Sequence, residues 1–231
     1  MATITPVKIG GLDITKFEPA GTPNGGVIII FYGSDGMKEP WGSMIQDYAQ
    51  ALGQKGFVAF IPDYLGFTKT EPGPGVFSVI EEKRSQWEGA LADAIDHAKV
   101  GAKGVGLLGF SLDGHLCLRL RAKADILVEF FAPVLDGIGA PGKLSHAQIH
   151  HGKDDKVPGT DFHNAEVIKD VLEHERTPTE LYSYDNAGHG FISPALGGID
   201  LGGTDLGNAN AHTESWARTL KFFAAYLEPG V

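Results

Sequence analysis

The chain has 231 residues, enough to bury one substantial core, and its 42% hydrophobic and 21% charged residues are ordinary proportions for a folded protein. These proportions exclude a disordered or fibrous chain. A formal net charge of −10 disfavours partners that require a basic surface, so we expect neither nucleic acid nor a membrane as a partner. We expect one domain over residues 1–231, present as a monomer or a dimer.

The single cysteine, Cys117, excludes an internal disulfide and is expected to be a buried packing residue. Residues 1–6 lack the basic and then apolar pattern of a secretory signal. No apolar run approaches the roughly 20 residues of a membrane-spanning helix. The sequence therefore predicts a cytoplasmic protein without a membrane span.

The first predicted elements are a hairpin, a strand and a helix. Residues 7–15 alternate apolar and polar side chains around a Gly-Gly turn, which is typical of an antiparallel hairpin at a sheet edge. Residues 27–31 are continuously apolar, as expected for a strand that is covered on both faces. Apolar residues then recur at helical spacing over 41–52, and Gly56 is positioned to end this helix.

Strands and helices continue to alternate to the end of the chain. A strand at 57–61 is followed by a loop at 66–76, and Ser78 and Glu81 have the spacing of a capping box at the start of the next helix. The remaining predicted elements are a strand at 105–110, a helix at 112–122, strands at 126–131 and 147–151, a helix at 165–173, a strand at 181–184 and a closing helix that ends near 227. This alternation predicts an α/β fold with a mainly parallel sheet, helices on both faces and an N-terminal antiparallel hairpin.

In such a sheet, ligands bind at the carboxyl ends of the strands, so reactive side chains that directly follow strands are candidates for an active site. Ser111 follows the strand at 105–110 and opens a helix, in the segment Gly109-Phe110-Ser111-Leu112-Asp113-Gly114. This is the sequence setting of a nucleophile elbow, a tight turn that exposes the hydroxyl and aims the next N–H at an oxyanion. We expect Ser111 to be the nucleophile.

Two further reactive side chains follow strands. Asp154 comes just after the strand at 147–151, and His189 comes just after the strand at 181–184. An imidazole takes the serine proton best when a carboxylate fixes its tautomer, and the order Ser, Asp, His is that of α/β-hydrolases. We therefore expect Asp154 as the acid and His189 as the base, with the adjacent Asp155 as the alternative acid.

Several segments together resemble the dienelactone hydrolase family of α/β-hydrolases. They are residues 27–31, Ile61-Pro62-Asp63-Tyr64, 109–114, 152–158, 184–191 and the final helix. The resemblance implies a carboxylic ester hydrolase that acts on a small molecule without a cofactor. It assigns the nucleophile to Ser111, the acid to Asp154 and the base to His189.

The resemblance also implies an oxyanion hole made by the N–H of Leu112 with that of Ser34 or its neighbour Gly33. The best-known members of the family carry a glutamate where this chain has Gly33 and an arginine where it has Ser193. Without these groups we expect the substrate to be a small neutral ester or lactone. Hydrolysis of anionic lactones is the alternative, for which Arg84 would supply positive charge.

Asp113 stands where the elbow of that family has a second glycine. Its carboxylate lies one residue past the first oxyanion donor, where it would strain the turn or repel the oxyanion. This departure motivates another alternative, a non-catalytic ligand-binding protein with a hydrolase-like fold.

Aromatic residues in or beside the loops that surround the predicted site are Tyr32, Trp41, Phe67, Phe77, Phe131 and Phe191. Core packing is the ordinary role of such residues, but we expect Tyr32, Phe67, Phe77 and Phe191 to contact the substrate. The Gly-rich segment 197–207 is longer than most connections and is either a mobile flap over the histidine or a passive loop.

Neither a dinucleotide nor a metal is expected. The glycines of residues 104–109 match a dinucleotide fingerprint, but they form a predicted strand instead of following one. His150, His151, Asp154 and Asp155 are grouped as metal ligands often are. Adjacent residues on a strand point to opposite faces, however, so the two histidines cannot easily share one ion.

Overall fold

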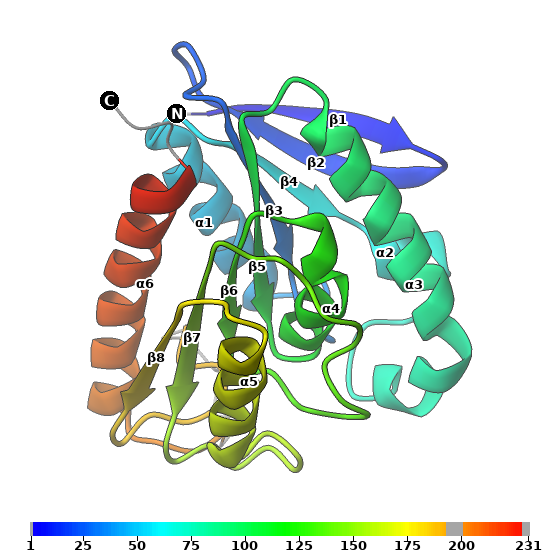
Figure 1. Cartoon of the computed structure of the whole chain (residues 1–231). Coiled ribbons are helices and arrows are strands. Elements are labelled where there is room, and N and C mark those ends of the chain that lie inside the picture. The colour runs from blue at the N-terminus through cyan, green and yellow to red at the C-terminus, as the bar shows by residue number, and fades with distance from the viewer. Residues whose placement is uncertain (1, 193–200, 228–231) are drawn as a thin grey trace.

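A computed structural model describes residues 2–192 and 201–227 of the chain (Figure 1). Its strands are β1 (Thr3–Ile9), β2 (Leu12–Glu18), β3 (Gly26–Phe31), β4 (Val58–Pro62), β5 (Gly104–Phe110), β6 (Ile126–Phe130), β7 (His146–Gly152) and β8 (Thr179–Tyr184). Its helices are α1 (Trp41–Gln54), α2 (Tyr64–Phe67), α3 (Val76–Lys99), α4 (Leu112–Leu120), the 3₁₀ helix η1 (Arg121–Lys123), α5 (His163–His174) and α6 (Asp205–Leu227).

The strands form one eight-stranded sheet in the order β1-β2-β4-β3-β5-β6-β7-β8. β1 and β2 make the predicted antiparallel hairpin, and β2 continues antiparallel to β4. All other neighbours are parallel, from β4 through β3 to β8. The expected fold is therefore confirmed, an α/β-hydrolase fold with a mainly parallel sheet.

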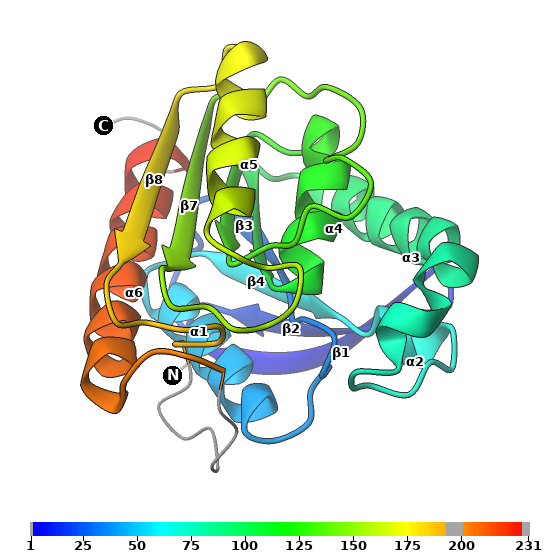
Figure 2. The ribbon, with the colours of Figure 1, turned by 90° about the horizontal axis from the view of Figure 1, so that it is seen from below.

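The sheet is covered on both faces, as its central strands require. Helices α1 and α6 pack on one face, and α3, α4 and α5 pack on the other (Figures 1 and 2). Every residue of β3 and β6 is buried, which explains why β3 is apolar along its whole length and why β6 is apolar at every position except Glu129. Because the parallel strands share one direction, the loops that follow them gather at one edge of the sheet.

Local signals placed two element boundaries wrongly. Helix α3 begins at Val76 with Gly75 as its N-cap residue, so Ser78 lies inside the helix and donates its hydroxyl to the Gly75 carbonyl oxygen at 2.7 Å. The capping-box prediction was therefore wrong, and the predicted loop at 66–76 also contains the end of α2. The hydrogen bonds of the preceding turn set the start of α3.

Part of the predicted flap at 197–207 lies outside the described residues, namely 197–200. Of the remainder, Gly202 and Gly203 form isolated β-bridges with Asp155 and Ala187, and residues 205–207 belong to α6. None of the described helices is both long enough and apolar enough to cross a membrane.

Candidate active site

Ser111 lies at a sharp turn between β5 and α4. Its backbone has φ 53° and ψ −126°, a conformation that non-glycine residues rarely adopt and that costs on the order of 1–3 kcal/mol. The Ser111 N–H anchors the turn by donating to the Phe130 carbonyl oxygen at 2.9 Å. The turn thus has the backbone geometry of a nucleophile elbow at the carboxyl end of the sheet.

Two glycines allow this turn to pack closely. A Cβ atom at Gly109 would lie 2.5 Å from the Asp113 carbonyl oxygen, and one at Gly114 would lie 2.8 Å from the Ala132 Cβ. Both distances are shorter than real Cβ contacts. Side chains at these positions would push the elbow away from the sheet.

His189 reaches Ser111 from the loop that follows β8. Its Nε2 lies 2.9 Å from the Ser111 Oγ, and its backbone N–H donates to the Leu201 carbonyl oxygen at 2.8 Å. The imidazole packs against the Phe131 ring, with 4.5 Å between the ring centroids. The histidine is buried. Its backbone hydrogen bond to Leu201 and the contact of its ring with Phe131 hold it in this orientation.

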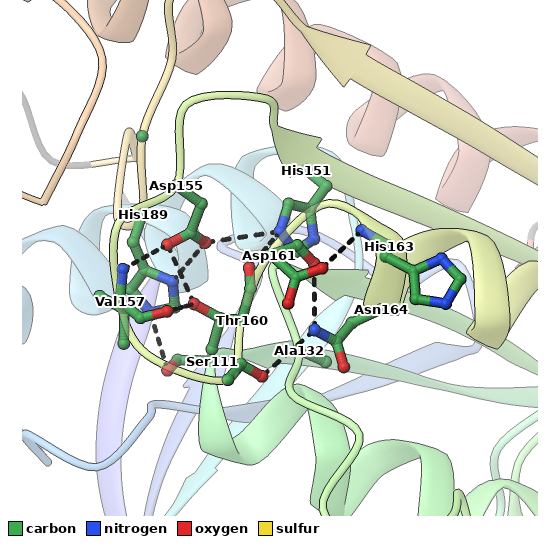
Figure 3. Close-up of polar contacts among 12 residues, drawn as sticks. Ser111, Ala132, His151, Asp155, Val157, Thr160, Asp161, His163, Asn164 and His189 are labelled. Atoms are coloured by element: carbon green, nitrogen blue, oxygen red, sulfur yellow. Dashed lines mark hydrogen bonds and ion pairs between the residues drawn. The ribbon is translucent and has the colours of Figure 1, made fainter.

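The second nitrogen of His189 meets a carboxylate, that of Asp155. The distance between His189 Nδ1 and Asp155 Oδ2 is 2.8 Å, and the other carboxylate oxygen accepts the Val157 N–H and the Thr160 hydroxyl, each at 2.9 Å (Figure 3). Burial raises the pKa of Asp155, but hydrogen bonds from His151 and His189 outweigh this effect and leave the pKa below its ordinary value. Asp155 is therefore held as an anion beside the imidazole.

The prediction of Asp154 as the acid was wrong, and the alternative, Asp155, occupies the position beside His189. The loop after β7 directs the side chain of Asp154 to solvent, while its backbone N–H donates to the Ala187 carbonyl oxygen at 2.9 Å. Asp155 forms a β-bridge with Gly202, which fixes the direction of its side chain. Only this tertiary pairing distinguishes two adjacent aspartates.

His151 is a site residue that the sequence reasoning missed. Its Nε2 donates to the Thr160 carbonyl oxygen at 2.7 Å and lies 3.4 Å from Asp155 Oδ2, so one carboxylate oxygen faces two imidazoles (Figure 3). His151 is fully buried at the end of β7. Its position four residues before Asp155, at the carboxyl end of a strand, was the available signal.

Of the three residues expected to form the oxyanion hole, the structure contradicts one, Gly33. The N–H of Gly33 donates to Asp113 Oδ2 at 2.8 Å, so Gly33 does not offer a free donor and its assignment was wrong. Ser34, the next residue, lines the cavity beside Ser111. Leu112 is the first residue of α4, where a backbone N–H has no carbonyl in a preceding turn to donate to.

Asp113 is turned away from the cavity, under the loop that carries Ser34. It is fully buried and accepts hydrogen bonds from Gly33 N–H and from the Tyr64 hydroxyl, the latter at 2.5 Å. Burial raises the pKa of Asp113 to about 7, although these two hydrogen bonds act in the opposite direction. Asp113 therefore does not face the oxyanion as expected. Its hydrogen bond to Gly33 instead joins the elbow to the loop after β3.

A cavity of about 330 Å³ opens beside the Ser111 hydroxyl. Its walls are mainly apolar and aromatic, and the lining residues are Tyr32, Ser34, Asp35, Trp41, Met44, Pro74, Phe77, Phe110, Ser111, Phe131, Val157, Pro158, His189, Gly190, Ile192 and Leu201. They include Tyr32 and Phe77, for which contact with the substrate stays a prediction. Asp35 was not expected here, although its place just after Ser34 was a signal.

Three predicted substrate contacts lie elsewhere. Phe191 is fully buried in the core, with its ring centroid 5.4 Å from that of Phe131, and Phe67 on α2 is 42% exposed and does not line the cavity. Arg84 on α3 is ion-paired with Asp136 at 2.8 Å and is also absent from the cavity wall. The two aromatic residues were expected at the site because they lie in or near its loops in the sequence, and Arg84 because of its charge. Neither property shows whether a side chain points toward the cavity or away from it.

The described residues contain no group of three or more His, Cys, Asp and Glu side chains arranged to hold a metal ion. His150 is instead bound between the Tyr184 hydroxyl and Gln148 Oε1, each at 2.8 Å, on the opposite face from His151. Cys117 is a buried thiol, as predicted.

The sheet topology, the strained serine turn and the imidazole beside it define the chain as an α/β-hydrolase. The model of the dienelactone hydrolase family matches residues 12–227. The chain belongs to the dienelactone hydrolase family and is a hydrolase of ester or lactone bonds.

The chain is also similar to individual proteins, one in sequence and two in fold. A carboxymethylenebutenolidase of Rhodococcus opacus is 26% identical over 199 residues, which cover 79% of this chain and 75% of that protein. A dienelactone hydrolase-like promiscuous phosphotriesterase from metagenomic libraries has a similar structure, with a TM-score of 0.76, 20% identity and coverage of 97% and 98% of the two chains. The structure of esterase 2 of Thermogutta terrifontis with bound propionate is also similar. Its TM-score is 0.66 at 15% identity, and the match covers 100% of this chain and 97% of that chain.

Proposed function

We propose that the protein is a serine hydrolase that cleaves small neutral esters or lactones through Ser111, His189 and Asp155. The observation that carries the proposal is the chain of contacts from Ser111 Oγ to His189 and on to Asp155, beside a mainly apolar cavity. Two carboxylate-imidazole-hydroxyl distances below 3 Å in this order are the geometry of an activated serine.

The proposed reaction is two-step acyl transfer. The Nδ1–H of His189 stays hydrogen-bonded to the Asp155 carboxylate, while Nε2 takes the Ser111 proton and Oγ attacks the carbonyl carbon, so that an imidazolium forms beside the carboxylate. The N–H groups of Leu112 and Ser34 stabilise the negative charge that develops on the carbonyl oxygen. His189 then protonates the leaving alcohol, and a water molecule repeats the attack on the acyl-enzyme.

The composition of the cavity wall supports a neutral substrate. Among the described lining residues there is no lysine or arginine, and Asp35 is the one carboxylate. The name of the Rhodococcus relative denotes a carboxylated lactone, which requires a compensating cation. Arg84, the proposed source of that charge, is paired with Asp136 outside the cavity, so we do not favour anionic lactones here.

The non-catalytic alternative loses its motivation. It was suggested by a carboxylate in the elbow, and the Asp113 carboxylate is bound to Gly33 and Tyr64 away from the cavity.

The proposal is tested with para-nitrophenyl acetate and a fluorophosphonate label. We expect the wild type to release a burst of nitrophenol and to take the label at Ser111, because both reactions require an activated hydroxyl. Ser111→Ala should lose at least about 10³-fold in kcat/KM and all labelling. Ser78→Ala, on the exposed start of α3, is the control and should behave as the wild type. A folded wild type without label, or a burst that persists in Ser111→Ala, would overturn the proposal.

A further inference from the structure

Asp35 places an unpaired carboxylate in the candidate active site. It follows Ser34 in the loop after β3, lines the cavity and is partly buried. Within residues 2–192 and 201–227, its side chain makes no hydrogen bond or ion pair. The catalytic steps proposed above do not use this group.

No lysine or arginine among the described residues pairs with Asp35. Lys38, three residues further along, is exposed and donates its ammonium group to the Pro72 carbonyl oxygen at 2.7 Å. The described part of the wall contains no lysine or arginine, and the sequence of residues 193–200 contains none either. Burial raises the pKa of Asp35 and outweighs the electrostatic effects of Lys38 and His189, which act in the opposite direction. A partly desolvated carboxylate of this kind is stabilised when a bound ligand places a cation beside it.

The remaining walls suit the same kind of ligand. Tyr32, Trp41, Phe77 and Phe131 all line the cavity. The faces of aromatic rings attract cations, and quaternary ammonium groups are bound in proteins by aromatic side chains of this type. One anion together with several aromatic rings therefore favours an organic ammonium group over a neutral group of equal shape.

We propose that Asp35 is a specificity-determining residue that selects esters carrying a substituted ammonium group. This inference rests on the proposed esterase function and extends its substrate class from neutral esters to cationic ones, which it places first. Asp35 binds the cationic part of the substrate, and Ser111, His189 and Asp155 carry out the bond cleavage. The preferred order of substrates is cationic, then neutral, then anionic.

The test compares esters that differ only in replacing the quaternary nitrogen by carbon. One pair varies the alcohol part, acetylthiocholine against the 3,3-dimethylbutyl thioester of acetic acid. The other varies the acyl part, with para-nitrophenyl 4-(trimethylammonio)butanoate against para-nitrophenyl 5,5-dimethylhexanoate. In at least one pair, the wild type should favour the cation in kcat/KM, and Asp35→Asn should lower this preference about 5- to 10-fold, as one partly screened charge contact predicts. The responding pair identifies the part of the substrate that Asp35 faces.

Taking a ratio removes any effect of Asp35 on the imidazole, because both esters of a pair use the same base. Asp47→Asn is the matched control, since it removes one negative charge from an exposed site on α1, outside the cavity. It should leave the ratios unchanged. The inference is overturned if Asp35→Asn leaves both ratios at the wild-type value, or if Asp47→Asn lowers them equally.

Binding provides a readout that does not depend on hydrolysis. Calorimetric titration of Ser111→Ala with phenyltrimethylammonium should show binding that weakens about 5- to 10-fold when Asp35→Asn is added. If the wild type hydrolyses none of the esters but this loss appears, the esterase proposal fails and the ammonium site stands. If hydrolysis depends on Ser111 while neither binding nor the ratios respond to Asp35→Asn, the ammonium site fails and the esterase proposal stands.

Discussion

At the scale of the residue, the adjacent aspartates Asp154 and Asp155 differ in the direction in which their side chains point, and this decides which of them contacts the histidine. Both follow the same strand and have the same chemistry, yet only Asp155 contacts His189, at 2.8 Å. Asp154 is exposed. Its backbone, and not its side chain, contributes to the loop, through a hydrogen bond to Ala187.

Asp155→Asn is expected to lower kcat/KM for para-nitrophenyl acetate by about 10³- to 10⁴-fold, because an amide favours the wrong imidazole tautomer. Asp154→Asn should stay within about threefold of the wild type, as a surface substitution does. Steady-state rates at pH 8 for both variants decide the assignment. A larger loss in Asp154→Asn than in Asp155→Asn would contradict it.

His151 is expected to act as a positioning residue for Asp155. His151→Phe removes the donor to Thr160 and the second imidazole beside Asp155, so kcat should fall about 10- to 100-fold through misalignment of the base. KM should change little, because His151 does not line the cavity. His151→Gln, which keeps an N–H donor, should recover part of the rate. Equal loss in both variants, or a change confined to KM, would argue against this role.

At the scale of the element, the β5-to-α4 turn depends on two glycines that the sequence motif contains and that packing explains. Gly109 leaves room for the Asp113 carbonyl oxygen, and Gly114 leaves room for Ala132. The strained backbone of Ser111 is tolerated because the elements on either side of it are fixed. β5 is paired inside the sheet, and α4 packs on the face of the sheet.

Gly109→Ala should therefore lower the free energy of unfolding by about 1–3 kcal/mol, the usual range for overpacking. Gly89→Ala is the matched control, because this glycine lies on an exposed face of α3 and a Cβ there would meet nothing within 4 Å. It should raise the free energy of unfolding by about 0.5–1 kcal/mol through better helix propensity. Urea unfolding curves measure both changes, and equal effects would show that the elbow is not closely packed.

At the scale of the whole molecule, stability is expected to depend on carboxyl groups that the fold buries. Asp113 and Glu129 are both fully buried, and burial raises the pKa of each to about 7. A raised pKa means that the folded state holds its proton more tightly than the unfolded chain does. The resulting stabilisation is complete below the unfolded-state pKa and is lost as the pH rises through about 7.

For Asp113, whose pKa rises from 3.8 to about 7, the loss between pH 5 and pH 8 is roughly 2–3 kcal/mol. Asp113→Asn removes this titration. Its amide oxygen can still accept from the Gly33 N–H, and its NH₂ group can donate to the oxygen of the Tyr64 hydroxyl, which is the donor in the wild type. We expect this variant to gain stability relative to the wild type by that amount between pH 5 and pH 8. Urea unfolding at the two pH values measures it, and a difference that is constant with pH would refute a buried, titrating Asp113.

Much of this architecture could be predicted from local patterns. Apolar runs such as 27–31 and 105–110 mark strands buried on both faces, and the segment around Ser111 marks the elbow. The one-domain organisation and the cytoplasmic location stay predictions. The capping box at Ser78 failed because competing turn hydrogen bonds started α3 earlier.

The sequence by itself determined the alternation of strands and helices, the family resemblance, and the meeting of Ser111 and His189 at one end of the sheet, because these depend on residue type and on position after a strand. Only the tertiary structure decided which aspartate meets His189, that Gly33 N–H is bound by Asp113, and that Arg84, Phe67 and Phe191 lie outside the cavity. It also brought Asp35 into that cavity. Side-chain direction in a loop is set by contacts with distant segments, such as the bridge between Asp155 and Gly202, and no local pattern encodes those contacts.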